Sequence, residues 1–378
     1  MIYFDGAATT LQKPDSVAKA MGAAITNLAS PGRGGHKASM GAAEVAYSCR
    51  EAAAELFGVS DPERVVFTHN ATHALNIAIK NQAQAGDRVV ISGYEHNSVT
   101  RPLQAIRAKV VVAKSALFCK ASAVRAFNET LTPDTKLVVL NHVSNVFGSI
   151  LPIEEIAAMC RVRRIPFIID VSQSAGVLEI RADELGADFI TMPGHKGLYG
   201  PQGTGLLICK SLPDQTLIEG GTGSDTRQLA MPESLPDRLE AGTHNMPGIS
   251  GLLEGIRFVK AHRTRIVEHE RTLLERLAKG LHRIPDLYLY KSPETHQQTG
   301  VLSFRIAGLD CESIAEALSE QDIALRAGLH CAPLAHESAG TLETGTIRVS
   351  FSAFNTEREV DTFLSILAQM RKGLRKKE

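Results

Sequence analysis

Short apolar runs bounded by turn residues alternate with helix-like patterns through the first two-thirds of the chain. After the first run, Leu75, Ala78 and Ile79 fall on one face of a helix that begins near Thr72. Runs that are apolar on both faces and separated by helices predict a mostly parallel sheet covered on both sides, and hence an α/β fold. The predicted strands are residues 64–68, 87–92, 109–113, 137–141, 165–170, 188–191 and 205–208.

The pattern changes after about residue 248. The elements predicted beyond it are a long helix with mixed outer charges at 249–281, strands at 301–306 and 346–351, and helices at 312–320 and 357–370. We therefore predict two domains. The large α/β domain covers 13–250, and a smaller α+β domain is formed by 251–378 together with 1–12.

Composition excludes several classes of protein. The 378 residues carry 41 basic and 41 acidic side chains, which gives no general reason to expect binding to nucleic acid or to an anionic membrane. No run approaches the roughly 18 apolar residues of a spanning helix, and Asp5 interrupts the N-terminal apolar stretch, so we expect no signal peptide. Six scattered cysteines do not form a disulfide framework and favour a reduced, cytoplasmic setting.

The most informative segment is 191–205, where Lys196 follows a predicted strand and precedes a glycine-rich turn. Ligands of open α/β sheets bind at the carboxyl edge of the strands, where this amine is expected. A partly desolvated lysine can lose its proton and attack a carbonyl to form a Schiff base. A lone loop lysine is more often simply exposed, and the glycines and His195 around Lys196 favour the chemical interpretation without deciding it.

Asp170 ends a predicted strand 26 residues before Lys196. A carboxylate at that edge can bond a protonated ring nitrogen, which pyridoxal phosphate needs because its pyridinium is the electron sink for a carbanion at the substrate Cα. Gln173 can then donate to the phenolic oxygen of the ring. The structural alternative is an aspartate that caps a turn beside an incidental glutamine.

Two further polar residues follow neighbouring strands. Thr72 lies at a strand-to-helix turn, whose backbone N–H groups suit a phosphate, although an ordinary helix cap explains it equally well. His96 follows the next strand, where a flat ring can stack on a cofactor. A hydrogen-bonded loop histidine is the alternative for His96.

A second polar cluster lies in the predicted small domain. Arg348 interrupts an apolar strand, where a guanidinium needs an anionic partner and matches a carboxylate bidentately. Cys331 follows His330 in a loop rich in glycine and proline and is a candidate reactive thiol, or else a small buried residue. A zinc site made of His330, Cys331 and His336 is disfavoured, because the sequence has no second pair of ligand residues at the spacing typical of zinc sites. We expect no metal.

Together these motifs resemble the cysteine desulfurase/selenocysteine lyase family, within the class V aminotransferases of the fold type I pyridoxal-phosphate enzymes. The resemblance covers nearly the whole chain and implies a large domain with a mostly parallel seven-stranded sheet. It also implies a small domain that carries the cysteine loop and an arginine for the substrate carboxylate. The motifs, in family order, are residues 3–10, 33–36, 95–96, 144–148, 170–173, 194–196, 240–243 and 326–331.

The resemblance implies roles in holding pyridoxal 5′-phosphate. Lys196 would bind the cofactor covalently and shuttle protons, and His96 would stack on the ring and take part in proton transfer. Asp170 would pair with the ring nitrogen and Gln173 with the phenolate. The residues implied for the phosphate are Thr72, His195 and, from the neighbouring subunit of a homodimer, Thr243.

The resemblance also implies a reaction. Asn145, Arg348 and His36 would bind a small amino acid, L-cysteine or L-selenocysteine. Cys331 would attack its sulfur, releasing L-alanine and leaving a persulfide for a possible acceptor protein. Two alternatives stay open: another class V reaction, such as transamination or β-elimination with Cys331 incidental, and a scaffold that has lost the chemistry.

The sequence also departs from the family pattern. Pro193 stands where many relatives place a serine hydroxyl against the phosphate, so one phosphate contact is expected to be missing or replaced. Residues 219–226 differ from the usual glycine-rich segment of the family. These differences indicate a divergent branch, in which the cofactor is more firmly predicted than the substrate.

Overall fold

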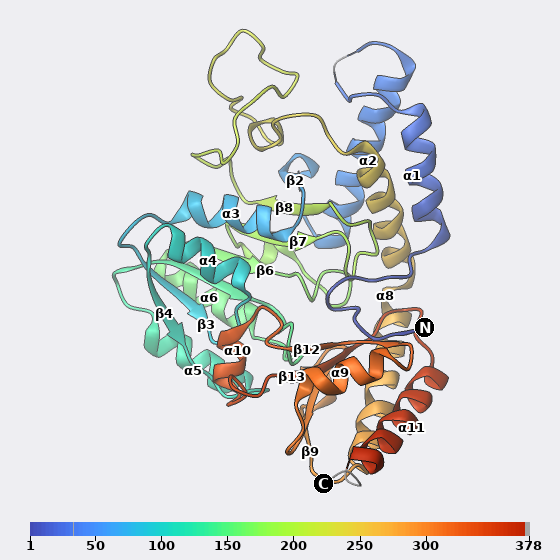
Figure 1. Ribbon diagram of the computed structural model, residues 1–378. Helices are drawn as coiled ribbons and strands as arrows, with labels where there is room; N and C mark the ends of the chain where they lie inside the picture. Colours follow the sequence, from blue (N-terminus) through green and yellow to red (C-terminus); the bar gives the residue numbers. More distant parts are fainter. Residues whose placement is uncertain (33, 375–378) are drawn as a thin grey trace.

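The computed structural model describes residues 1–32 and 34–374. Its larger sheet has seven strands in the order β2-β8-β7-β6-β5-β3-β4 (Figure 1). β8 is antiparallel to both of its neighbours, and the other pairings in this sheet are parallel. The strands are β2 (Val65–Thr68), β3 (Arg88–Ser92), β4 (Lys109–Ala113), β5 (Thr135–Asn141), β6 (Phe167–Asp170), β7 (Phe189–Pro193) and β8 (Gly205–Cys209), and all seven predicted runs are confirmed.

The central strands carry apolar residues on both faces because helices cover both faces of the sheet. Val90 and Val138 pack into one core, whereas Val89 and Val139 pack into another on the opposite face. α3 (Ala71–Gln82) and α4 (Asn97–Ala105) contribute to the second core. The first core receives α5 (Lys120–Thr130) and α6 (Ile153–Arg163), and the short α7 (Ala182–Leu185) follows.

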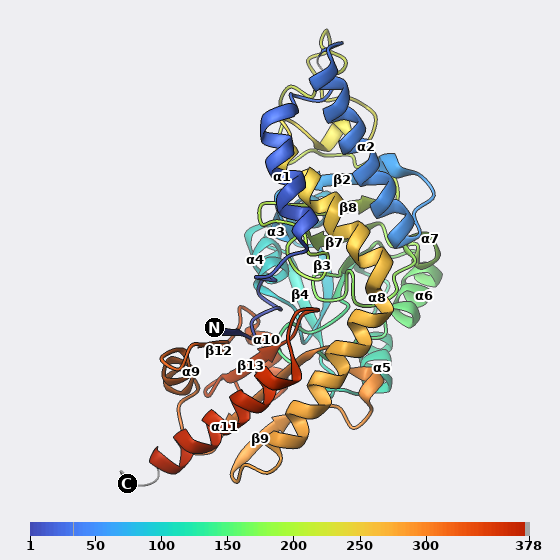
Figure 2. The ribbon, with the colours of Figure 1, turned by 90° about the vertical axis from the view of Figure 1, so that its right-hand side faces the viewer.

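Three long helices pack beside the sheet, and the hydrophobic pattern predicted only one of them. α1 (Asp15–Asn27) and α2 (Lys37–Phe57) both lie against α8 (Met246–Leu281) (Figure 2). α8 is close to the loop that follows β7, because a Cβ at Gly255 would lie 2.3 Å from the carbonyl oxygen of Leu198. This helix therefore supports the segment that carries Lys196.

A four-stranded antiparallel sheet lies below the large sheet in Figure 1. Its strands, in spatial order, are β12 (Arg326–Gly328), β13 (Thr346–Ser350), β10 (Val301–Ile306) and β9 (Leu287–Tyr290). Phe304, Val349 and Phe363 fill its core. The remaining elements in this half are α9 (Cys311–Ser319), α10 (Pro333–Ser338), α11 (Glu357–Leu374) and the 3₁₀ helix η3 (Thr295–Gln297). Two further 3₁₀ helices, η1 (Pro62–Arg64) and η2 (Asp237–Leu239), occur earlier in the chain.

The N-terminal strand belongs to a separate two-stranded sheet that shares the core of the antiparallel sheet. β1 (Ile2–Tyr3) pairs in parallel with β11 (Ile323–Ala324), and Phe4 is buried in the same core as Phe304. The division into two domains stays a prediction. The predicted boundary between residues 250 and 251 falls inside α8, which continues from the large sheet to β9 and α11 (Figure 2).

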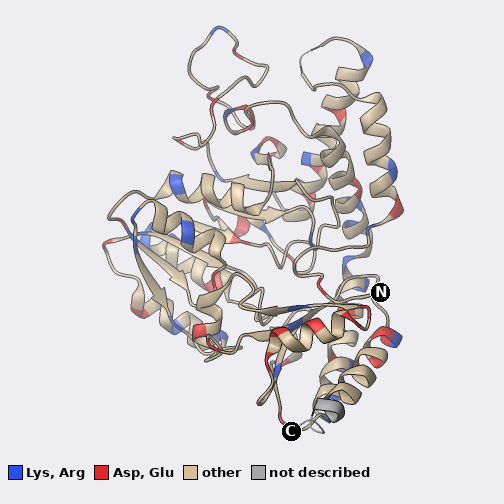
Figure 3. Cartoon of the chain, viewed as in Figure 1, with Lys and Arg blue, Asp and Glu red and all other residues tan. Residues whose placement is uncertain are grey.

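Charge is distributed evenly over the molecule. Figure 3 shows Lys and Arg interspersed with Asp and Glu on helices and loops, as the equal numbers of basic and acidic residues suggest. Within residues 1–32 and 34–374, every helix is too short or too polar to span a bilayer.

Candidate active site

A cavity of about 210 Å³ opens at the carboxyl ends of the parallel strands. Parallel strands place the residues that follow them at one edge of the sheet, which is where ligands bind in this type of fold. The structure brings together eight residues predicted from the sequence. They are Thr72, His96, Asn145, Asp170, Gln173, His195, Lys196 and Arg348.

Lys196 follows β7 and its amine has no hydrogen bond or ion pair with any described residue. Burial lowers the pKa of this amine to about 8, with the Asp170 carboxylate acting in the opposite direction. The segment is held from the N-terminal side, because Thr10 N (3.0 Å) and Lys13 Nζ (3.2 Å) both donate to the His195 carbonyl. The result is a fixed lysine that is more easily deprotonated than one in water.

Asp170 ends β6 as a buried acid. Ser172 donates to its Oδ1 from both the backbone N (2.9 Å) and Oγ (2.5 Å). Burial raises the pKa of Asp170, and the two Ser172 bonds and Lys196 act against that rise. A cationic ring nitrogen beside this carboxyl would favour its ionised form. Gln173 is already engaged, because its Nε2 donates to the Ala7 carbonyl at 2.9 Å.

The N-termini of α3 and α4 face the cavity. Asn70 caps α3 by accepting from His73 N at 2.9 Å, so Thr72 is not the cap, and its hydroxyl lines the cavity 2.8 Å from Ser98 Oγ. His96 caps α4, where Nδ1 accepts from Ser98 N at 3.0 Å. Burial lowers the pKa of His96 to about 4, with Lys196 acting in the same direction, so the ring is neutral and carries its proton on Nε2.

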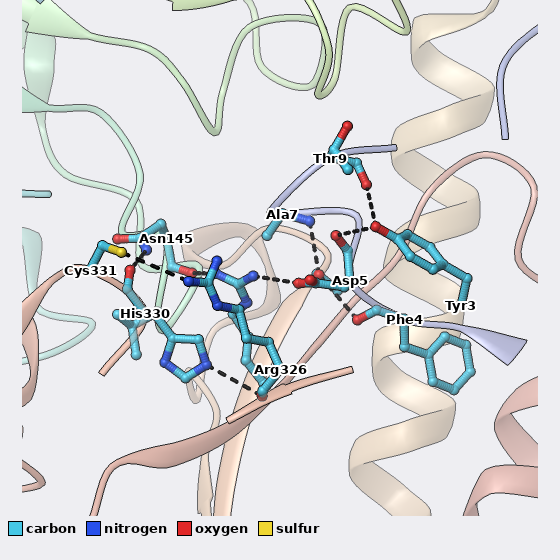
Figure 4. Close-up of polar contacts among 12 residues, drawn as sticks. Tyr3, Phe4, Asp5, Ala7, Thr9, Asn145, Arg326, His330 and Cys331 are labelled. Carbon is cyan, nitrogen blue, oxygen red and sulfur yellow. Dashed lines mark hydrogen bonds and ion pairs between the residues drawn. The ribbon is translucent and has the colours of Figure 1, made fainter. Parts of the chain in front are cut away.

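Arg348 lies in β13, and 1% of its surface is exposed. Its Nη2 contacts Asp5 Oδ1 at 2.6 Å, and its Nη1 donates to the Asn145 carbonyl at 2.9 Å. The Asn145 amide in turn donates to the His330 carbonyl at 2.8 Å (Figure 4). Among the described residues, Arg348 Nε and Asn145 Oδ1 are buried without a hydrogen-bond partner.

Asp5 was missed as a site residue. In the sequence it is a charge inside an N-terminal apolar stretch and part of the motif at residues 3–10, but it lies 343 residues from Arg348 and no local signal connects the two. Glu95 is a second missed acid. Its Oε1 accepts from Ser92 Oγ (2.5 Å) and Asn141 N (3.0 Å), so it joins the ends of β3 and β5, and burial raises its pKa to about 8.

The segment around Cys331 lies between two regular elements, since residues 326–328 form β12 and α10 begins at Pro333. His330 and Cys331 both have positive φ values, of 51° and 56°. Asn97 N donates to the Cys331 carbonyl at 2.8 Å, which fixes the backbone from the side of α4. Cys331 is exposed, and its Sγ lies 3.8 Å from Nη2 of Arg326, which lines the cavity (Figure 4). Cys331 itself does not line the cavity, but Arg326 and its neighbour His330 do.

Two predicted residues lie away from this cavity. His36 caps α2, where Nδ1 accepts from Ser39 N at 3.4 Å, and Thr243 lines a separate cavity of about 70 Å³ with Glu240 and His244. Arg33, part of the motif that contains His36, lies outside the described residues.

The two departures from the family pattern differ in position. Pro193 lines the main cavity, as its motif position suggests, whereas residues 219–226 do not line it. No three described His, Cys, Asp or Glu side chains group as metal ligands.

The cavity fits a phosphorylated aldehyde with a basic ring nitrogen. Lys196 offers a buried amine, Asp170 offers a buried carboxyl, and the α3 N-terminus offers backbone N–H groups at residues 70–72. His195 also lines the cavity, and its Nδ1 is buried without a partner in the part of the chain that the structure describes. An amine for the aldehyde, an acid for the ring nitrogen and N–H groups for the phosphate are what pyridoxal 5′-phosphate requires.

The aminotransferase class-V family model matches residues 2–363, and the chain belongs to this family. Its members are enzymes that use pyridoxal 5′-phosphate, so the cofactor predicted from the sequence is confirmed.

Within the family, the chain groups with the cysteine desulfurases. A probable cysteine desulfurase from Pyrococcus abyssi is 33% identical, over 99% of this chain and 95% of the relative. A probable cysteine desulfurase from Mycolicibacterium paratuberculosis is also 33% identical, and there the chain spans 56% of the relative's length. The apo structure of a cysteine desulfurase from Thermococcus onnurineus superposes with a TM-score of 0.87 at 30% identity, covering 98% and 95% of the two chains. The predicted family and fold are thus confirmed.

Proposed function

We propose that the protein is a pyridoxal-phosphate-dependent cysteine desulfurase. It converts L-cysteine, or L-selenocysteine, to L-alanine and leaves the sulfur or selenium on Cys331. The observation that carries this proposal is the place of Cys331 directly beside Arg326 and His330, which line the Lys196 cavity. The segment that carries it is bonded to both Asn97 and Asn145. An ordinary aminotransferase has no use for a thiol fixed there.

The residues of the cavity divide into those that hold the cofactor and those that hold the substrate. Lys196 binds the cofactor covalently, Asp170 pairs with its ring nitrogen, and His96 stacks on the ring. When bound, the cofactor supplies the electron sink for a carbanion at the substrate Cα. Gln173 pairs with the phenolate oxygen, and Thr72 and His195 bind the phosphate.

Substrate binding and proton transfer follow from the remaining groups. Arg348, which lines the cavity, binds the substrate carboxylate through its guanidinium. Asn145 fixes both the Arg348 guanidinium and the Cys331 segment, so it aligns the carboxylate with the thiol. The Lys196 amine removes the Cα proton and returns it, which its pKa of about 8 permits near neutral pH.

Cys331 performs the sulfur transfer. Its thiolate attacks the substrate sulfur, forming an S–S bond while the Cβ–S bond breaks. The electron pair of the broken bond is left on Cβ and takes up a proton, which yields the methyl group of alanine. A persulfide remains on Cys331. Because Cys331 is exposed, an acceptor protein can reach that persulfide.

The same proposal includes a homodimer in the cytoplasm. Thr243 of the partner subunit reaches the phosphate, and His36 completes the substrate site from the dimer interface, since neither residue lines the cavity of its own chain. Exposed apolar side chains on α1 and α2, at Ile25, Met40 and Tyr47, support an interface on that side. The six cysteines of the described chain are free, which suits a reduced setting.

The test is a panel of amino acids assayed for alanine, pyruvate and sulfide with the cofactor-loaded protein. We expect cysteine to give alanine and sulfide in the presence of a thiol reductant. Cys331→Ala should lower that rate at least ~100-fold while still binding the cofactor, because no described cysteine lines the cavity and could take over the role of this thiol. Cys119→Ala, which removes the other exposed thiol, is the matched control and should leave the rate unchanged.

Other outcomes select the alternatives. An unchanged rate in Cys331→Ala, or pyruvate as the main product, would favour a different class V reaction. Turnover of selenocysteine without turnover of cysteine in Cys331→Ala would assign a selenocysteine lyase. A wild-type protein that stays colourless with added cofactor would support a scaffold without catalytic activity.

A further inference from the structure

The N-terminal strand delivers Asp5 to Arg348 through backbone contacts. Asp5 forms a parallel β-bridge with Ser350, and Gly6 N donates to the Ser350 carbonyl at 3.2 Å. The approach is so close that a Cβ at Gly6 would lie 2.7 Å from the Phe351 carbonyl oxygen. Because residues two apart share a face of a strand, the neighbour of Ser350 on that face is Arg348.

The loop beyond Asp5 is also fixed. Tyr3 Oη donates to the carbonyls of Asp5 (3.3 Å) and Thr9 (2.8 Å), which closes the turn that carries the carboxylate (Figure 4). The side chains of Arg348 and Asp5 are 2% and 19% exposed, so their ion pair is largely shielded from water. Asp5 does not itself line the cavity, whereas Arg348 does.

The Arg348 guanidinium therefore serves both the protein and the cavity. Its Nη2 contacts Asp5, its Nη1 donates to the Asn145 carbonyl, and the residue also lines the cavity. A carboxylate that Arg348 binds in the cavity shares this one guanidinium with Asp5. Two carboxylates that share one cation repel each other, and that repulsion subtracts from the affinity of the second one.

We propose that Asp5 is a built-in counterion that sets how tightly Arg348 binds the carboxylate of the amino acid. This inference rests on the proposed function, because it takes Arg348 as the substrate anchor. Asp5 keeps the buried guanidinium neutralised and oriented when the cavity is empty, since an unpaired buried charge is costly. It also keeps the anchor weak, so that alanine, which retains its carboxylate, leaves after turnover.

The test is the affinity of the cofactor-loaded protein for L-alanine, measured by calorimetry beside L-alaninol, which lacks the carboxylate. Asp5→Asn keeps the shape and an oxygen acceptor for Nη2 but removes the charge. We expect Asp5→Asn to bind L-alanine on the order of tenfold more tightly and L-alaninol no differently. Asp15→Asn, an exposed acid on α1 outside the cavity, is the control for net charge and should change neither value.

Each contrary outcome has its own meaning. Equal or weaker L-alanine binding by Asp5→Asn, in a protein that unfolds at the wild-type temperature, would overturn the counterion role. If Arg348→Lys binds L-alanine as the wild type does, the carboxylate anchor in the proposed function is wrong, whatever Asp5 does. If Asp5→Asn does not fold, the affinities for L-alanine and L-alaninol are measured with Asp5→Ser instead. If neither variant folds, the role of Asp5 is in stability and the counterion proposal is rejected.

Discussion

Replacement of Lys196 by alanine is expected to abolish turnover of cysteine, with a loss on the order of 10⁴-fold or more in kcat/KM. The variant removes both the covalent link to the cofactor and the base that moves the Cα proton. No other described lysine lines the cavity. Lys13, the nearest along this surface, is bonded to Thr10 Oγ1 at 2.6 Å and to the His195 carbonyl. It therefore cannot take over the role.

Borohydride reduction followed by peptide mass analysis checks the same residue without an activity assay. In the wild type, the cofactor mass should appear on the peptide that contains Lys196, and in Lys196→Ala on no peptide. Lys210→Ala removes an exposed lysine after β8 and should behave as the wild type. Cofactor found on a different lysine, or full activity of Lys196→Ala, would contradict the proposed site.

Glu270→Gln is expected to stabilise the protein strongly at alkaline pH. Glu270 lies on α8, 6% exposed, with no hydrogen bond or ion pair to the residues that the structure describes. Burial raises its pKa from 4.5 to about 8. The folded protein thus holds a neutral acid that ionises on unfolding, so stability is full below pH 4.5 and is lost as the pH rises to 8. The loss amounts to roughly 5 kcal/mol, because each pKa unit is worth about 1.4 kcal/mol.

Denaturant unfolding at pH 4.5 and pH 8.5 measures this effect. Glutamine keeps the size of the side chain without the ionisation, so Glu270→Gln should match the wild type near pH 4.5 and exceed it by several kcal/mol at pH 8.5. Glu268→Gln, exposed on the same helix, should show no such difference. Equal stability of Glu270→Gln and the wild type at pH 8.5 would mean that Glu270 is not held neutral.

The local sequence predicted the strands of the large sheet well, but it did not predict the helices α1 and α2 that pack beside that sheet. The middle of β3, at Val89, Val90 and Ile91, is apolar on both faces because helices cover both, and that run is visible in the local sequence. α2 packs instead through alanines, at Ala42, Ala46 and Ala53. Such small residues give no clear apolar stripe, so a hydrophobic pattern does not mark this helix.

The same distinction holds for the site. Thr72, His96, Asp170 and Lys196 each follow a strand of one parallel sheet, so the topology alone places them at one edge. Asp5, the ion-pair partner of Arg348, could not be found in this way. Its position depends on a β-bridge between Asp5 and Ser350 that no local sequence pattern encodes. The backbone bonds that fix Cys331 are likewise products of tertiary structure.

The uninterrupted course of α8 constrains how the molecule can move. One rigid rod of 36 residues packs on α1 and α2 at one end and into the core beneath the antiparallel sheet at the other. A hinge between the two halves would have to bend or break this rod. Any movement of the half that carries Arg348 relative to the half that carries Lys196 would therefore have to be accommodated by this helix.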